Sequence, residues 1–280
     1  MKIGCNYYLE TEQLFDEGMI ELDYFKYPAE IFHMDIMADL DAFEDFCGRL
    51  TAKRPILLHG LYPAPHDLSS PDLRADFDDK IAGRLIKMTK TPGVSFHSTL
   101  SRLAGDIDFA GIFGIIKDNA KFLRDKYADM EFVSIENADY MRQWGSLIRA
   151  EVITELINET GCDFLLDVSH AYCASSDIGV DFHDYLKALP LDKVVEVHIN
   201  GWIENENGRM CHTIINEEAY QALHEVLQHC RPKFITVEYG RPNDRIGSGC
   251  PVMLPDKINH EAKKEIIEQI SKIKKIAGKI

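Results

Sequence analysis

Short apolar runs alternate with amphipathic stretches along the whole chain of 280 residues. The runs predict eight strands, at 2–7, 24–28, 55–61, 93–97, 131–137, 162–168, 194–200 and 234–240. Helical patterns lie between them, at 39–50, 71–89, 107–127, 147–159, 182–189, 217–228 and 256–277. This alternation is typical of a parallel sheet. Eight such units predict an α/β fold, a (β/α)8 TIM barrel in one domain over 1–280, with a doubly wound open sheet as the alternative.

From the third predicted strand onward, each strand ends in an acidic or histidine side chain. These residues are His59, His97, Glu136, Asp167, His198 and Glu238. In a (β/α)8 barrel the carboxyl ends of the strands meet at one mouth, so residues one βα unit apart become neighbours in space. Buried carboxylates are costly unless they are paired, hydrogen-bonded or coordinated. The pattern therefore predicts a metal site at the mouth of the barrel.

His170 and His212 extend the set to eight candidate ligands. Imidazoles together with carboxylates suit zinc, iron or manganese. One ion uses about four to six donors, some of them water, so eight protein donors predict two or three ions bridged by carboxylates. Glu136 and Asp167 are the predicted bridges. Together with His198 they are also the predicted catalytic residues.

Each candidate has an ordinary structural alternative. Asp167 could cap the following helix, and His170 could be a loop histidine. His59 and His97 could be core histidines that hydrogen-bond to the backbone. Only the recurrence of such residues at six successive strand ends favours the metal site over these alternatives.

Other polar residues have less specific roles. Glu196 lies two residues before His198 and points to the same side of its strand, so it could orient that imidazole or form a plain salt bridge. The remaining histidines are predicted to lie at the surface: His33, His66, His183, His224, His229 and His260. The seven cysteines are scattered and include no CxxC pair, which disfavours a thiolate site and favours a reducing compartment.

The charge of the chain restricts its partners. The formal net charge of −15 disfavours binding to nucleic acid, because phosphate recognition needs a basic surface. No apolar run approaches the length needed to cross a bilayer, and the first residues show no signal-peptide pattern. We therefore expect a cytoplasmic protein that contacts neither nucleic acid nor membrane.

The order of these residues resembles the ligand order of the xylose-isomerase-like barrel superfamily, in particular endonuclease IV with its multinuclear zinc site. A closer resemblance is to the multinuclear non-heme iron-dependent oxidases, the family of the methanobactin-biosynthesis oxidase. Residues 184–201 are similar to that family's pattern YLxALPxxxVxEIHLAG. Residues 165–168 are similar to its LLDVNN motif, and residues 58–60 to its LHG motif.

The resemblance implies a function that composition and spacing do not. It implies an enzyme with two or three iron ions of mixed valence that activate dioxygen and oxidise a cysteine-containing or other residue of a ribosomally made peptide. A small thiol is the alternative substrate. Relatives of this kind often work with a separate peptide-recognition protein, so a separate partner protein and a small-molecule substrate both stay open here.

The chain departs from the family pattern at three positions. Met210 stands where the family usually has the Asp of an Asp-x-His motif, so one metal could be absent or differently bound. His170 stands where the family often has Asn, and it could supply a replacement donor. After the last strand, the segment 237–240 keeps only Glu238 of the usual Glu-Trp-Asp.

Two other functional classes stay open on the sequence. The first is a divalent-metal hydrolase or a sugar isomerase or epimerase of the same superfamily, using zinc, manganese or magnesium. Such isomerases usually need only one or two ions, which would leave His59 and His97 in surplus. The second is a barrel without catalytic activity. It would have to bury six strand-end ligands without a metal, which desolvation makes expensive.

Overall fold

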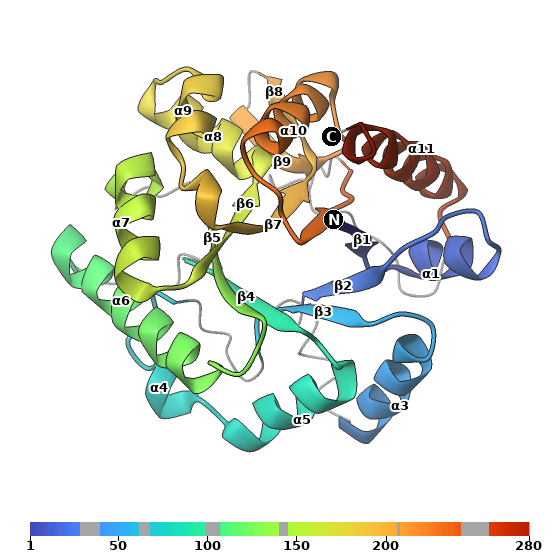
Figure 1. Cartoon of the computed structure of the whole chain (residues 1–280), viewed down its shortest axis with the longest axis horizontal. Coiled ribbons are helices and arrows are strands. Elements are labelled where there is room, and N and C mark those ends of the chain that lie inside the picture. Colours follow the sequence, from blue (N-terminus) through green and yellow to red (C-terminus); the bar gives the residue numbers. More distant parts are fainter. Residues whose placement is uncertain are drawn as a thin grey trace.

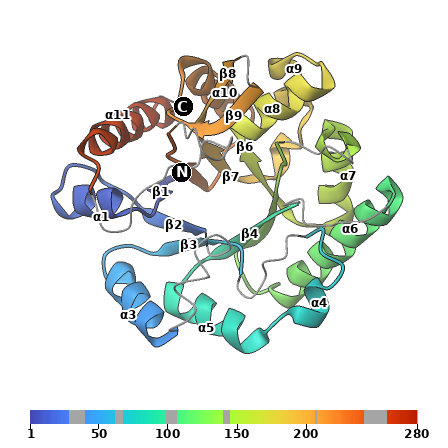
Figure 2. The same ribbon diagram turned by 180° about the vertical axis from the view of Figure 1, so that it is seen from behind.

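Eight parallel strands close into a barrel in the computed structural model, which describes residues 1–28, 40–61, 68–98, 107–139, 145–205, 208–241 and 258–279. The strands are β1 (Lys2–Asn6), β2 (Tyr24–Pro28), β3 (Ile56–His59), β4 (Gly93–His97), β5 (Phe132–Glu136), β6 (Asp163–Asp167), β7 (Val194–Ile199) and β10 (Phe234–Val237). Their order around the barrel is β1-β10-β7-β6-β5-β4-β3-β2. Figures 1 and 2 show this barrel from its two ends, with helices around it. The predicted (β/α)8 barrel is confirmed.

The helices surround the barrel in chain order. They are α1 (Leu9–Asp16), α3 (Leu40–Thr51), α4 (Leu73–Asp76), α5 (Asp79–Thr89), α6 (Phe109–Lys126), α7 (Ala150–Thr160), α8 (Val168–Ile178), α9 (Phe182–Ala188), α10 (Glu217–His229) and α11 (His260–Ala277). Short 3-10 turns, η1 (Gly145–Ile148) and η2 (Leu191–Lys193), precede α7 and β7. Within the described residues, no helix is long and apolar enough to span a membrane.

Three helical regions differ from the sequence prediction. The helix expected at 71–89 is two helices, because the backbone at Phe77 is extended between α4 and α5. Helix α1 was not predicted, since it has only eight residues and buries Glu10 and Glu12, so it lacks a clear apolar stripe. Helix α8 was not predicted either. Most of its residues through Ser175 are buried, so no polar face marks its period.

Alternate residues of the strands fill the inside of the barrel in layers. The layer near the strand starts is apolar, and the rings of Tyr24 and Phe132 both pack on Phe234. Gly93 makes room for this layer, because a Cβ there would lie 2.4 Å from the Phe132 ring. The next layer is polar and contains Lys26. The apolar layer near the strand starts therefore separates the mouth of the barrel from its opposite end.

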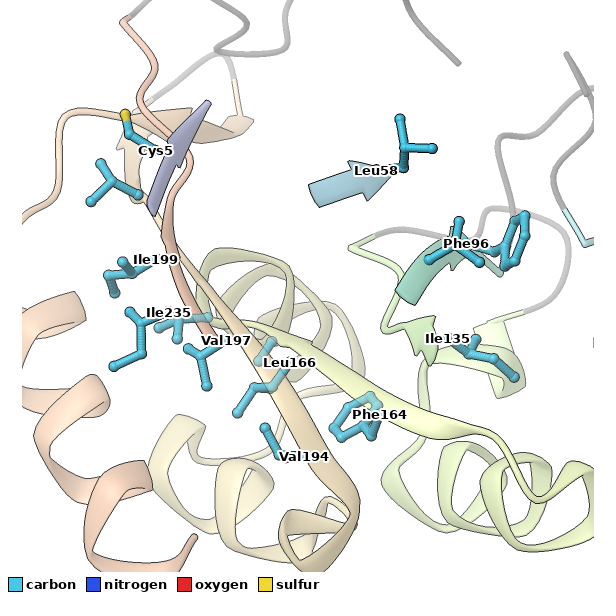
Figure 3. Packing of buried hydrophobic residues seen from close by; sticks show 14 of the residues in the cluster. Cys5, Leu58, Phe96, Ile135, Phe164, Leu166, Val194, Val197, Ile199 and Ile235 are labelled. Carbon is cyan, nitrogen blue, oxygen red and sulfur yellow. The ribbon is translucent and has the colours of Figure 1, made fainter. Parts of the chain in front are cut away.

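The other face of each strand packs against the helices. These outward side chains belong to one large buried cluster that includes Leu58, Phe96, Leu166, Val197 and Ile235. Figure 3 shows Ile235, Val197 and Leu166 together on one part of the barrel, and Leu58 and Phe96 on another part. Burial of this apolar surface is the main favourable contribution to folding, at about 25 cal/mol per Å². The mouth can therefore be polar without loss of the fold.

The predicted surface histidines fall into two groups. His224, His229 and His260 are exposed, and His183 is half-buried beside Glu225. His33 and His66 lie outside the described residues.

Candidate metal centre

The strand register brings the six predicted strand-end residues into one region. Between β4 and β5, His97 is paired with Glu136, and between β6 and β7, Asp167 is paired with His198. His59 ends β3 on one side of this row, and Glu238 follows β10 on the other. Glu136, Asp167, His198 and His59 are all at most 2% exposed. Four ionisable groups with so little access to water require mutual compensation or a cation.

The first group of donors consists of two imidazoles and one carboxylate oxygen. Nε2 of His59 lies 3.0 Å from Oε2 of Glu136, and Nε2 of His97 lies 3.1 Å from the same oxygen. The two nitrogens are 3.2 Å apart. Consider two donor atoms that each lie about 2.1 Å from the same ion. If the angle between them at the ion lies between the square and the tetrahedral value, the two atoms are about 3.0–3.4 Å apart. These three atoms therefore have the mutual spacing of a facial ligand set.

A second group of donors begins at the other oxygen of Glu136. Nδ1 of His198 lies 3.3 Å from Oε1 of Glu136 and 3.3 Å from Oε2 of Glu238. Oδ2 of Asp167 is farther away, 4.0 Å from the same nitrogen. Glu136 thus lies between the two groups and presents one oxygen to each. That is the position of the bridging carboxylate predicted from the sequence.

Several polar atoms at this point have no hydrogen-bond partner among the described residues. They include both carboxylate oxygens of Glu136 and Nδ1 of His198. The imidazole nitrogens near Glu136 lie close to it without the geometry of a hydrogen bond. A buried carboxylate left in this state costs several kcal/mol, whereas bound cations compensate it directly. The donor set therefore fits metal ions.

The charges of the metal-free cluster shift the pKa of its members. Burial raises the pKa of Glu136, but the imidazoles of His97 and His59 outweigh it and hold this pKa well below its ordinary value. Burial lowers the pKa of His198, yet the carboxylates of Glu238 and Glu196 raise it well above the ordinary value. The charged forms of Glu136 and His198 are therefore both favoured by neighbours of opposite charge.

The polar layer beneath the mouth orients two of the imidazoles. Nδ1 of His59 lies 2.8 Å from Oγ of Ser95, which leaves Nε2 facing Glu136. Nε2 of His198 donates to the carboxylate of Glu196 at 3.2 Å, which leaves Nδ1 facing the mouth. Glu196 also pairs with the buried ammonium of Lys26 at 2.6 Å. Glu196 therefore both orients His198 and forms a salt bridge, so both alternatives considered for it are present.

Asp167 likewise has features of both of its alternatives, the helix cap and the metal ligand. Its Oδ1 accepts the backbone N–H of His170 and the hydroxyl of Ser169, so it caps the first turn of α8. Its Oδ2 faces the second donor group and accepts from Asn200 at 2.7 Å. Only one oxygen is available to a metal. Glu238 places one oxygen, Oε2, close to both His198 and His212.

His170 lies in the first turn of α8 rather than in a loop. Its Nδ1 donates to the backbone oxygen of Asn137 at 2.9 Å, because a carbonyl can only accept. The other ring nitrogen, Nε2, then carries a lone pair. Metal-ligating histidines are usually held by such a backbone contact on the opposite nitrogen. The orientation of His170 is therefore that of a ligand.

A hairpin after β7 brings the last predicted residue to the mouth. Its strands are β8 (Gly201–Asn205) and β9 (Gly208–Thr213), which were not predicted because they lie within a single βα connection. Trp202 of β8 stacks on Tyr172 of α8 with ring centroids 4.3 Å apart. Arg209 of β9 pairs with Asp177 at the end of α8. These contacts place His212 with its Nε2 at 3.2 Å from Oε2 of Glu238.

Two residues at the mouth were not predicted from the sequence. Asn200 directly follows β7 and donates to Glu238 at 3.0 Å as well as to Asp167. Its position one residue beyond a strand end was the available signal. Cys211 is buried and approaches His212, with Sγ at 3.1 Å from Nδ1. Scattered cysteines were taken to argue against a thiolate, but the hairpin brings this one into the cluster.

The donors therefore form three neighbouring sets that could each hold a metal ion. They are His59 with Glu136 and His198, Glu136 with Asp167, His198 and Glu238, and His170 with Cys211 and His212. All eight predicted ligands lie in this region. Their assignment as ligands stays a prediction.

Residues 120–242 match the family described as RiPP precursor modification enzyme MbnB/TglH/ChrH. The resemblance stated from the motifs is confirmed. The matched segment contains six of the eight predicted ligands, from Glu136 to Glu238.

Curated relatives match over shorter segments. The UPF0276 protein of Chromobacterium violaceum is 33% identical over 92 residues, which are 32% of this chain and 33% of that protein. The UPF0276 protein of Bordetella pertussis is 34% identical over 117 residues, which are 39% of this chain and 40% of that protein. The matches thus span between a third and two fifths of the length of these relatives.

Solved structures of low sequence identity share the fold over nearly the whole chain. D-psicose 3-epimerase in the presence of D-fructose has a TM-score of 0.64 and 12% identity, covering 99% of this chain and 100% of that one. The probable 3-DHS dehydratase AsbF of Bacillus anthracis has a TM-score of 0.60 and 13% identity, covering 98% of both. These neighbours therefore share the TIM-barrel fold of this chain.

Proposed function

We propose that this chain is a multinuclear iron-dependent oxidase that uses dioxygen to modify a cysteine-containing peptide or a small thiol at the barrel mouth. The observation that carries the proposal is Glu136, a buried carboxylate whose two oxygens lack hydrogen bonds and face imidazoles on opposite sides. One bridging carboxylate between two donor groups is the arrangement of a centre with more than one ion. The match to a family of peptide-modifying enzymes supports a peptide substrate.

The residues of the mouth have distinct roles in this proposal. His59, His97 and Glu136 would hold one ion, because both imidazoles lie within 3.1 Å of the same carboxylate oxygen. Glu136, His198, Asp167 and Glu238 would hold a second. Iron would supply dioxygen binding and one-electron oxidation, which amino-acid side chains cannot perform. We retain Glu136, Asp167 and His198 as the catalytic residues, because they lie on three adjacent strands at the centre of the cluster.

The surroundings of these ligands fix their orientation. Glu196 holds the proton on Nε2 of His198 and so keeps Nδ1 as the donor atom. Asn200 holds one oxygen each of Asp167 and Glu238. The ligands are thus preorganised, so that little rearrangement opposes metal binding.

The family match supports a peptide as the substrate. We propose that this substrate is a ribosomally made peptide and that a separate recognition protein presents it. An acidic chain at −15 favours a basic or neutral peptide over a nucleic acid.

Metal analysis of protein purified without oxygen tests the proposed function. We expect at least two equivalents of iron and oxygen uptake with a synthetic cysteine-containing peptide. A Glu136→Gln variant should lose both, and a Glu131→Gln variant, at an exposed residue at the other end of the same strand, should retain both. Zinc or manganese alone, without oxygen uptake, would overturn the iron-oxidase proposal.

The second candidate is a divalent-metal hydrolase or a sugar isomerase or epimerase. The likeness to D-psicose 3-epimerase shows the fold alone. The number of donors argues against this candidate, because one or two ions would leave part of the cluster without use. The same metal analysis separates the two functions.

A further inference from the structure

The third set of donors differs from the other two because it contains sulfur. His170, Cys211 and His212 each offer one atom, and these atoms lie within 4.8 Å of one another. Cys211 is 6% exposed. The thiol is therefore enclosed in the same buried region as the two imidazoles.

An irregular pairing in the β8–β9 hairpin explains how neighbouring residues reach the same place. Gly201 is paired with Thr213 and Ile203 with Met210, so Cys211 and His212 together lie opposite Trp202. Two residues against one is a β-bulge. In a regular strand, successive side chains point to opposite faces. The bulge breaks this alternation, and Sγ of Cys211 comes within 3.1 Å of Nδ1 of His212.

The backbone at the bulge is held in an unfavourable conformation. His212 has a φ of +52°, the left-handed region that L-residues other than glycine seldom adopt. Such a conformation persists only where surrounding contacts impose it, and it occurs mostly at functional sites. Here those contacts are the stacking of Trp202 and the pairing of Arg209. The hairpin is thus anchored in a way that presents both side chains to the mouth.

The ring nitrogens around Cys211 are oriented to leave lone pairs at this set. His170 donates from Nδ1 to the oxygen of Asn137, which leaves Nε2 as the nitrogen available to a metal. Nε2 of His212 lies 3.2 Å from the carboxylate of Glu238, to which it can donate, and Nδ1 then faces the sulfur. A sulfur and a nitrogen that share one ion at about 2.3 and 2.1 Å are about 3.1–3.5 Å apart. The observed distance falls at the short end of this range.

We propose that Cys211 is a thiolate ligand of a third metal position, completed by His170 and His212. The proposal rests on the proposed metal centre. It also explains how the chain can have Met210 where the family usually has Asp. The bulge places the thiol of Cys211, rather than the side chain of residue 210, in the cluster. The ligand set suits a divalent transition metal that accepts both sulfur and imidazole, such as iron(II), zinc(II) or cobalt(II).

Binding exchanges a proton for the metal. The S–H bond of Cys211 breaks, a sulfur–metal bond forms, and the proton leaves by way of the Asp139 carboxylate. In the metal-free structure Cys211 donates to Oδ2 of Asp139 over 3.5 Å. The competing interpretation is that Cys211 is only a core thiol that donates to Asp139, with no metal at this position.

Cobalt(II) is the probe that separates these interpretations, since it reports metal binding and sulfur ligation by different absorption bands. We expect the wild-type protein titrated with cobalt(II) to show visible ligand-field bands together with a near-ultraviolet thiolate-to-cobalt charge-transfer band. Cys211→Ser should lose the charge-transfer band and about one equivalent of cobalt. Cys211→Asp should lose the band but keep the equivalent, because a carboxylate replaces the thiolate. Cys173→Ser, at a buried cysteine one turn after His170, should behave as wild type.

The outcomes distinguish this proposal from the metal centre on which it rests. Ligand-field bands without a charge-transfer band in the wild type would overturn the thiolate ligand and leave the metal centre intact. A charge-transfer band that survives Cys211→Ser would also overturn it. Absence of all cobalt bands would overturn the metal centre itself. The wild-type spectrum decides the question even if a variant does not fold.

Discussion

Glu196 and His198 lie two residues apart on β7, and the Glu196 carboxylate accepts a hydrogen bond from Nε2 of His198 at 3.2 Å inside the barrel. The same carboxylate pairs with Lys26 of β2 at 2.6 Å. All three side chains are at most 1% exposed. The orientation of one predicted ligand thus depends on a buried ion pair one layer below the mouth.

Removal of Lys26 should destabilise the protein strongly. Lys26→Met leaves the buried carboxylate of Glu196 without its partner, which should lower the free energy of unfolding by about 3–5 kcal/mol. Urea denaturation of the metal-free protein measures this change.

Two further variants control this experiment. Lys187→Met removes an exposed lysine that pairs with Glu225, and it should change stability little. Lys26→Met with Glu196→Met removes both charges and should restore part of the stability. Equal stability of Lys26→Met and Lys187→Met would contradict the buried ion pair.

Replacement of Glu136 should remove the stabilisation by metal and also lower the stability of the metal-free protein. Glu136→Gln removes the carboxylate that faces both donor groups, so the increase in melting temperature produced by added metal should largely disappear. The metal-free variant should melt below the wild-type temperature, because the imidazoles that hold the pKa of Glu136 well below its ordinary value lose their partner charge. Thermal scans with and without iron(II) under nitrogen test this. A full metal-induced increase in the variant would argue against Glu136 as a bridge.

His170→Ala should lower the metal content by about one equivalent. Nε2 of His170 faces the third donor set, and alanine in the first turn of α8 does not disturb the helix. Elemental analysis after anaerobic loading gives the stoichiometry, with His224→Ala at an exposed histidine of α10 as the control. Unchanged metal content would indicate that His170 has a structural role and is not a ligand.

Metal affinity should increase with pH and binding should release protons. Burial lowers the pKa of His170, but the nearby charge of Asp167 raises it well above the ordinary value. Burial also lowers the pKa of His212, but Cys211 and Glu238 together raise it well above the ordinary value. The raised pKa favours the protonated form of both imidazoles, so a metal that binds them should displace protons. Titration calorimetry with zinc(II) in buffers of different ionisation enthalpy measures the number released. Binding without proton release, or weaker binding at pH 8 than at pH 6, would contradict this assignment.

Strand ends could be predicted because their side chains follow a local rule. The interior residues of a barrel recur every second position, so His97 and Glu136 were recognisable as inward-facing ends of apolar runs. Their register, and hence their contact, follows from the closure of the barrel. Lys26 was not predicted, because a lone lysine in an apolar run carries no signal of the partner that it finds on β7.

By itself the amino-acid sequence determined the (β/α)8 barrel and the six candidate ligands at strand ends, because apolar periodicity and strand ends are properties of consecutive residues. Only the tertiary structure decided that Glu238 lies between His198 and His212 and that Cys211 enters the cluster. Both depend on distances between segments far apart in the chain, and the second depends on a bulge in a hairpin that no local pattern marks. A one-residue change in pairing reverses the direction of a side chain, so sequence spacing alone could not place that sulfur.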